Sequence, residues 1–205
     1  LYSFPSNDNA GERISIGFDF SFYGENYNSL IINPNGWVGF GDDNDAWDNS
    51  NIPASSAPGS AIFGLWDDLN PVNDNCNSYC SGNVYTHGNN ERFVIWFNEV
   101  AHWWTNFEDS YYNFQVVLYP NGDIDVNYSS LTGIHDATIG IQNATGTDGI
   151  QVASGSSFAT NNRSLFFSTG LDWLSFSGET TGQLAYGASS TITFDVSSAG
   201  LSNSD

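Results

Sequence analysis

The sequence predicts an all-β protein, an antiparallel β-sandwich of the jelly-roll or immunoglobulin-like kind with minimal helix. Apolar and polar residues alternate with a period of two wherever the chain is not turning, which is typical of half-buried strands. Two Asn-Gly pairs, in PNG (34–36) and PNG (120–122), stand between such segments and tolerate the positive φ angles of hairpin turns. No segment carries an apolar stripe with helical spacing, so we expect almost no helix.

The expected strands follow one another along the whole chain. The first, RISIGFDF (13–20), places four apolar residues on one face: Ile14, Ile16, Phe18 and Phe20. Further strands are expected at 29–33, 37–41, 61–66, 83–87, 92–97, 112–119, 123–128, 137–142 and 164–168. Many short strands joined by Gly-rich and Asn-rich turns indicate a sandwich or a barrel.

The pattern changes near residue 170. We expect a β-sandwich domain over 1–170 and a C-terminal tail over 171–205, with strands at WLSFS (173–177) and STITFDV (190–196). Two strands are too few to make a domain. The tail is therefore expected either to complete the sheets of the first domain or to be a partial immunoglobulin-like unit whose missing strands come from elsewhere by strand exchange.

The composition is strongly acidic, with three Arg, no Lys and 23 acidic residues, which give a formal net charge of −20. Nucleic-acid binders need basic patches to neutralise phosphate, so we expect no nucleic-acid partner. No apolar stretch approaches the roughly 20 residues that cross a bilayer, so we expect no membrane insertion. The chain is 40% hydrophobic, which is enough apolar surface to fold.

Surplus carboxylates repel one another, which makes calcium the expected cofactor. Two Asp-rich loops are candidate ligand sets, the first comprising Asp42, Asp43, Asp45 and Asp48, and the second Asp67, Asp68, Asn70 and Asp74. Neither spacing matches an EF-hand. A solvated acidic loop is the alternative for the first set, and a turn cap formed by Asp67 or Asp68 is an alternative for the second.

Cys76 and Cys80 are the only cysteines, and a zinc site there would lack further ligands. We expect a disulfide that closes this loop in an oxidising compartment, with two free thiols as the alternative. Three Asn-X-Ser/Thr sequons, at Asn127, Asn143 and Asn162, are candidate glycosylation sites. Such short motifs also arise by chance in an Asn-rich and Ser-rich chain.

The segment AHWWTNFEDSYYNF (101–114) is rich in aromatic residues. Four of them are candidates for contact with a glycan or a protein partner: Trp103, Trp104, Tyr111 and Tyr112. Neighbouring residues of a strand point to opposite faces, so at most one of each pair can lie in the core. Packing within the loop is the alternative.

Catalytic motifs are missing from the sequence. It contains no Gly-X-Ser-X-Gly elbow, no His-Glu-X-X-His and no Gly-rich phosphate loop, and His87, His102 and His135 are scattered. We therefore expect no enzyme. A carboxylate pair for glycoside hydrolysis is the one enzymatic alternative, because 23 acidic residues offer many pairs.

Five motifs, in this order and spacing, resemble the NIDO-like β module of nidogen-type matrix proteins and of secreted bacterial proteases and surface proteins. They lie at 20–41, 57–71, 82–100, 113–128 and 137–153. The resemblance covers about residues 13–168, and the tail is similar to the opening strands of immunoglobulin-like repeats. It implies an extracellular interaction or structural module without catalytic residues.

The resulting expectation is a non-enzymatic structural protein, secreted, extracellular or on the cell surface. Unpaired sheet edges favour a subunit of a filament or matrix, in which copies of the chain assemble by donor-strand complementation. The alternative is a glycan-binding adhesive module of a larger secreted hydrolase or surface protein. The expected partners are thus other copies of the chain or an extracellular polysaccharide.

Overall fold

The structure is a computed structural model, and it describes residues 1–43, 45–76, 79–103, 110–133, 136–155, 158–168, 174–176 and 194–196. The chain divides into two compact units, Leu1–Phe167 and Ser168–Asp205. The described residues form strands and turns but no helix, and hence none that could span a membrane.

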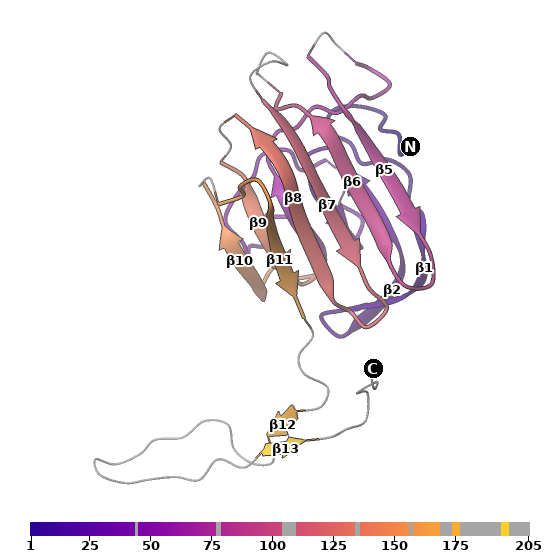
Figure 1. Cartoon of the computed structure of the whole chain (residues 1–205), viewed down its shortest axis with the longest axis vertical. Helices are drawn as coiled ribbons and strands as arrows, with labels where there is room; N and C mark the ends of the chain where they lie inside the picture. Colours follow the sequence, from indigo (N-terminus) through magenta and orange to yellow (C-terminus); the bar gives the residue numbers. More distant parts are fainter. Residues whose placement is uncertain are drawn as a thin grey trace, which may run out of the picture. The chain divides into compact units, whose positions relative to one another are not determined.

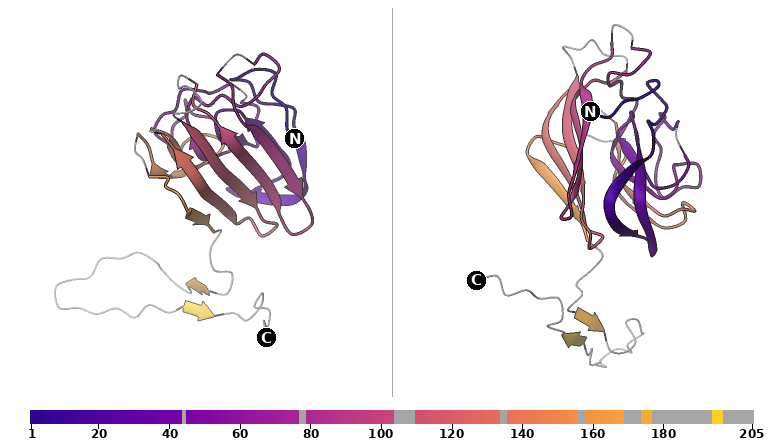
Figure 2. Two further views of the ribbon diagram at one scale, coloured as in Figure 1. Left: turned by 45° about the horizontal axis from the view of Figure 1, so that its top comes forward. Right: turned by 90° about the vertical axis from the view of Figure 1, so that its right-hand side faces the viewer.

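The first unit is a sandwich of two antiparallel sheets (Figures 1 and 2). The six-stranded sheet has the order β1 (Ile14–Phe22), β2 (Glu25–Asn33), β3 (Trp37–Gly39), β4 (Ala61–Trp66), β9 (Thr138–Gln142) and β10 (Gly149–Ala153). The five-stranded sheet has the order β11 (Arg163–Phe167), β8 (Ile124–Thr132), β7 (Tyr111–Leu118), β6 (Phe93–Val100) and β5 (Asn83–Gly88). The predicted all-β antiparallel sandwich is confirmed.

The main core lies between the two sheets, where the inward residue of each alternating pair is buried. Phe97 of β6 and Phe114 of β7 stack there with ring centroids 4.5 Å apart. Tyr128 of β8 crosses the core, and its hydroxyl donates to the Gly64 carbonyl of β4 at 2.6 Å. This bond ties the two sheets together without leaving a buried hydroxyl unsatisfied.

A second, smaller apolar cluster lies on the other face of the six-stranded sheet. It contains Trp37, Phe63 and Trp66, and the rings of the last two stack 4.8 Å apart. Ile52 and Ala57 from the long β3–β4 connection join it. The six-stranded sheet is therefore covered on both faces at this point, which explains why its β4 segment AIFGLW is buried at every position.

Both Asn-Gly pairs form the predicted hairpin turns. Gly36 joins β2 to β3 with a φ of 81°, and Gly122 joins β7 to β8 with a φ of 88°. At Gly36 a Cβ would lie 2.0 Å from the Leu65 carbonyl oxygen. Glycine is thus required at residue 36 by both conformation and space.

The N-terminal segment covers part of the β5 edge. The Tyr2 backbone N–H donates to the Val84 carbonyl at 2.8 Å, and Phe4 is fully buried in the main core. The Tyr2 hydroxyl donates to the Glu12 carbonyl at 2.7 Å. Residues at the start of the chain therefore complete this sandwich.

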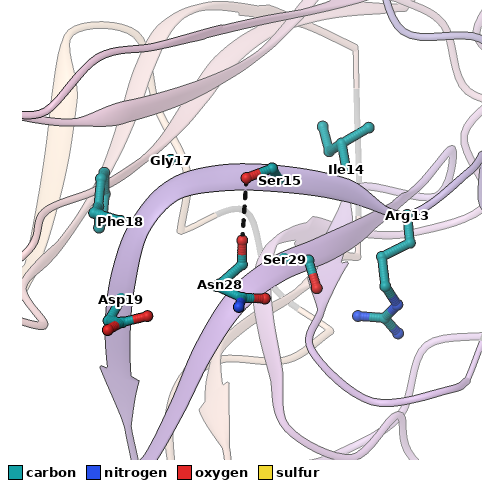
Figure 3. A pocket seen from close by; sticks show the side chains of 8 residues that line it. All are labelled: Arg13, Ile14, Ser15, Gly17, Phe18, Asp19, Asn28 and Ser29. Carbon is teal, nitrogen blue, oxygen red and sulfur yellow. Dashed lines mark hydrogen bonds between the residues drawn. The ribbon is translucent and has the colours of Figure 1, made fainter.

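The sheets differ from the expected pattern at two places. The alternation pattern does not predict β10, whose segment GIQVA is short and has Gly at its first position. In β1 the register with β2 shifts between Ser15 and Phe20, and Gly17 takes a φ of 94°. The bulge bends this edge strand beside an open hollow of about 480 Å³, where the Ser15 hydroxyl donates to the Asn28 carbonyl (Figure 3).

In the second unit, the described residues form one two-stranded sheet. β12 (Leu174–Phe176) pairs antiparallel with β13 (Phe194–Val196), and Leu174 lies opposite Val196. Both strands fall within the two tail segments that the sequence predicts. The remainder of the tail lies outside the described residues.

Candidate functional site

The most unusual polar group of the first unit follows the end of β4. We call it the Asp67 cluster and define it as Asp67, Asp68, Asn70 and His102. Asp67 is 3% exposed and Asn70 is 1% exposed. The Asp67 Oδ1 atom lies 3.3 Å from His102 Nε2 and also accepts the Asp68 backbone N–H at 2.9 Å.

Backbone pairing brings these distant residues together. Leu69 pairs with His102 in an isolated β-bridge, and the Asn70 N–H donates to the Ala101 carbonyl at 2.8 Å. The Trp103 N–H donates to the Asp68 carbonyl at 2.9 Å. The segment after β4 is therefore fastened along the segment after β6.

The turn between β2 and β3 supports the cluster from the other side. Asn35 is fully buried, and its Oδ1 atom accepts the Leu69 N–H at 2.9 Å. Its carbonyl accepts the Asp67 N–H at 3.2 Å. The same Asn-Gly pair thus makes the hairpin turn and positions the acidic segment.

The surroundings change the proton affinity of two groups in the cluster. Burial raises the pKa of Asp68 to about 6, against the opposing effect of nearby His102. The hydrogen bond that the His102 ring donates to the Asp67 carboxylate raises the pKa of His102. Three further carboxylates, Asp8, Asp48 and Asp136, act on one or the other of these groups through their charge.

Three buried polar atoms of the cluster have no hydrogen-bond partner: Asp67 Oδ2, Asn70 Oδ1 and Asn70 Nδ2. Buried polar atoms are normally satisfied, so these are positions for an ordered water or a bound ion. Oxygen ligands suit Ca²⁺. Within the described part of the chain, however, no three His, Cys, Asp or Glu side chains are grouped so as to hold a metal ion, and calcium stays a prediction.

The first Asp-rich loop has a different character, because its carboxylates are exposed. Asp42 lies 3.6 Å from the Arg13 guanidinium, and Asp43 Oδ2 accepts the Gly59 N–H at 2.8 Å. Asp43 and Asp45 line a hollow of about 340 Å³. Asp48 is also exposed, as is Asp74 after the Asp67 cluster.

One backbone atom fastens this exposed loop to the sandwich. The Ala46 carbonyl accepts the indole N–H of Trp37 at 2.8 Å and that of Trp66 at 3.1 Å. Both indoles belong to the smaller apolar cluster. The loop is therefore anchored at its centre while its carboxylates face solvent.

The predicted disulfide between Cys76 and Cys80 is present, with Cα atoms 5.8 Å apart. It closes the loop between the Asp67 cluster and β5. The neighbouring Asn75 amide donates to the Pro5 carbonyl at 2.8 Å, which joins this loop to the N-terminal segment.

The four aromatic residues predicted to contact a glycan or a protein partner differ in how far they are buried. Tyr112 is fully buried, whereas Tyr111 is 36% exposed, so the expected alternation is confirmed and burial removes Tyr112 from the contact candidates. Trp103 is half-buried beside the Asp67 cluster. Trp104 lies outside the described residues.

The three sequons also differ in accessibility. Asn127 is half-buried within β8 and accepts the Ser164 hydroxyl at 2.7 Å. Asn143 is half-buried, and its Oδ1 atom accepts the Thr147 N–H at 3.1 Å. Asn162 is exposed in the turn before β11. Glycosylation stays a prediction, and Asn162 is the most accessible of the three.

Comparison with known proteins gives one result. A family model described as NIDO related matches residues 1–196. The chain belongs to the NIDO-related family. The match extends beyond the part that the sequence motifs suggested and includes both strands of the second unit. Membership of this family, together with the disulfide, indicates an extracellular domain. No match was found among curated proteins or among solved structures.

Sequence reasoning missed several residues of this NIDO-related domain. The sequence shows His102 only as one of three scattered histidines, and it predicts only a turn role for Asn35. No local signal identifies their contacts with the Asp67 cluster, because the contacts depend on how the strands pack. The exposed side chains of Tyr85, Trp96 and Phe166 were also missed, although period-two alternation places each of them opposite a core position.

Proposed function

We propose that this chain is a non-enzymatic structural protein that is secreted or held at the cell surface, where copies of it assemble into a filament or matrix by strand addition. The supporting observation is the edge strand β11. It pairs with β8 in unbroken register from Arg163 to Phe167 and contains no carboxylate, and Phe166 is 62% exposed. An accessible strand of this kind is a template for pairing with another chain.

Each of the other three edges of the sandwich carries a protective feature, whereas β11 has only the charge of Arg163 at its first position. β1 has its bulge at Gly17 and the exposed Asp19, and β10 has a register shift between Gln151 and Ala153. Part of β5 is covered by the bridge between Tyr2 and Val84. Bulges, charges and covering segments are the usual means of blocking edge pairing.

The donor in this proposal is the second unit of a neighbouring copy. Its described strands β12 and β13 form a sheet of three residue pairs. An isolated two-stranded sheet is marginally stable in water, so pairing with a further strand would stabilise it. Because each copy has one acceptor edge and one donor unit, repeated addition gives an open chain of copies.

Electron microscopy and light scattering of the full chain test this assembly. We expect filaments for the wild type, loss of filaments for Phe166→Lys, and loss for Asp195→Pro, which removes a backbone donor from β13. Tyr111→Lys is the matched control, because Tyr111 is an exposed aromatic residue on the interior strand β7 of the same sheet. A monodisperse wild-type monomer, or filaments that persist in Phe166→Lys, would refute strand addition at β11.

Calcium binding at the Asp67 cluster is part of the proposal. It is supported by the two unpartnered oxygen atoms, Asp67 Oδ2 and Asn70 Oδ1. We expect CaCl2 to raise the melting temperature of the wild type relative to EDTA, and this increase to disappear in Asp67→Asn. An equal increase in both proteins would assign any bound calcium to another part of the chain.

A second candidate function is adhesion to a glycan, as an accessory module of a larger secreted hydrolase or surface protein. It is favoured by the outer face of the five-stranded sheet, where large aromatic side chains are exposed on several strands. Retention on immobilised polysaccharide by a monomeric variant that leaves this face unchanged, such as Asp195→Pro, would distinguish adhesion from assembly.

A further inference from the structure

The outer face of the five-stranded sheet carries one transverse row of aligned side chains. We call it the outer-face row and define it by the strand register, in the order Tyr85, Trp96, Gln115, Asn127 and Ser164. Each residue lies directly opposite the next on the neighbouring strand. The row therefore crosses all five strands, from β5 to β11, on the face turned toward the viewer in Figure 1.

One end of the row is an aromatic platform. Tyr85 is 37% exposed and Trp96 is 38% exposed, and their ring centroids lie 5.6 Å apart with 38° between the planes. An exposed aromatic face attracts the slightly positive C–H groups of a saturated ring that lies on it. The platform can thus take the apolar face of a pyranose ring.

The other end of the row is polar. The amides of Gln115 and Asn127 are half-buried, and the Ser164 hydroxyl donates to Asn127 Oδ1 at 2.7 Å. Amide and hydroxyl groups both donate and accept hydrogen bonds, as sugar hydroxyls do. Because the strands hold these groups in one line, their positions are fixed before a ligand arrives.

The row contains no acidic or basic side chain, although the chain as a whole carries a net charge of −20. An uncharged strip on such a chain favours an uncharged ligand, since the surrounding field repels anionic polymers. Five strands at a spacing of about 4.8 Å also give the row a length of roughly 19 Å. That length fits several linked sugar rings better than a single one.

We propose that the outer-face row binds a neutral polysaccharide, which runs across the strands, with sugar rings on Tyr85 and Trp96 and hydroxyls bonded to Gln115, Asn127 and Ser164. The proposal rests on the adhesion candidate given above, whose ligand class and contact residues it specifies, and it gives the sheet face a role that strand addition at β11 does not require. It also implies that a glycan on Asn127 would cover the polar half of the row and block binding.

The test is affinity gel electrophoresis of the full chain in gels containing laminarin, hydroxyethyl cellulose, amylose or mannan, with the anionic polymer alginate in a parallel gel. We expect retardation by at least one of the four neutral polymers and none by alginate. Trp96→Ala should weaken the binding by roughly tenfold or more, as the loss of an aromatic anchor does. Tyr111→Ala, on the same face but outside the row, should change it less than about twofold.

Two further measurements keep the test decisive. Gln115→Ala removes a polar contact without removing a large ring, so it tests the row even if Trp96→Ala is unstable, and it should also weaken binding. Each variant is compared in the Asp195→Pro background, which is expected to lose assembly without changing the sheet face, so that loss of assembly and loss of binding are seen separately. No retardation by any of the four neutral polymers, retardation by alginate, or equal retardation of the wild type and Gln115→Ala would overturn the proposal.

Discussion

The two Asp-rich segments of this NIDO-related protein have similar composition and opposite surroundings. The carboxylates of Asp42, Asp43 and Asp48 are exposed, whereas Asp67 is buried against His102 and the Asn35 turn. The exposed loop is fastened through a backbone carbonyl, and the buried segment is fastened through its side chains. Mutation should therefore affect stability at the buried segment far more than at the exposed one.

The largest effect is expected for Asp67→Ala. This change removes the partner of His102 and the acceptor of the Asp68 N–H, and it should lower the free energy of unfolding by about 3 kcal/mol. Urea denaturation measures the loss. Asp67→Asn keeps an oxygen at Oδ1, so its free energy of unfolding should fall clearly less than that of Asp67→Ala. If Asp67→Ala were as stable as the wild type, the contrast between the two segments would fail.

Asn35→Ala should have the next largest effect, about 2 kcal/mol, because the buried Leu69 N–H loses its acceptor. The matched control is Asn121→Ala in the other Asn-Gly turn, where the asparagine is exposed. We expect the control to change the free energy of unfolding by about 0.5 kcal/mol or less. Equal losses at the two turns would show that Asn35 acts only through turn geometry.

The dependence of stability on pH should also distinguish the buried segment from the exposed loop. The folded pKa of Asp68, about 6, lies above its ordinary value of 3.8, so the folded state holds a proton that the unfolded chain has released between these values. Stability should therefore fall as the pH rises through this window. The pKa of His102 is raised in the folded protein above its ordinary value of 6.5. Its stabilising contribution is therefore complete below pH 6.5 and is lost as the pH rises through the pKa of the folded state.

Both groups thus make the protein less stable at about pH 8 than at about pH 5. Because Asp68 is only half-buried, solvent screening reduces its share to about 1 kcal/mol. Thermal unfolding across this range checks the slope. Asp68→Asn should reduce the dependence of the melting temperature on pH in the acidic part of this range, and His102→Gln should reduce it in the upper part. An unchanged pH dependence in both variants would refute the assignment to these two groups.

The smallest effects are expected in the exposed loop. Asp43→Ala loses one hydrogen bond from the Gly59 N–H and should cost about 0.5 kcal/mol. Asp42→Ala removes only a solvent-exposed ion pair with Arg13 and should not change the melting temperature measurably. A loss in Asp42→Ala comparable to that in Asp67→Ala would remove the distinction between the segments.

The fold could be predicted from the sequence because its signals are local. Alternation identified β4 at its observed bounds, and the Asn-Gly pairs identified both hairpin turns. The start of β2 was missed, since its first residues, ENYN, are polar and partly exposed and give little apolar alternation. The burial of Tyr112 and the exposure of Tyr111 also follow from alternation alone.

The candidate sites could be predicted only in part, because they depend on contacts between distant residues. Nothing near Asp67 in the sequence distinguishes it from Asp43, and its burial comes from His102 and the turn at Asn35. The outer-face row likewise requires the register of five strands, which links Tyr85 to Ser164 across the sheet. The sequence shows which residue types are present in the cluster and the row, but it does not show which of these residues contact one another.

The shared bond at Ala46 gives this protein an internal optical signal. Among the tryptophans that the structure describes, Trp37 and Trp66 are buried and donate to the same carbonyl in the middle of the acidic loop. If a cation or a partner pulls that loop away, both indoles lose their acceptor together while the sandwich stays folded. Their fluorescence emission would then report loop release separately from unfolding, without any attached dye.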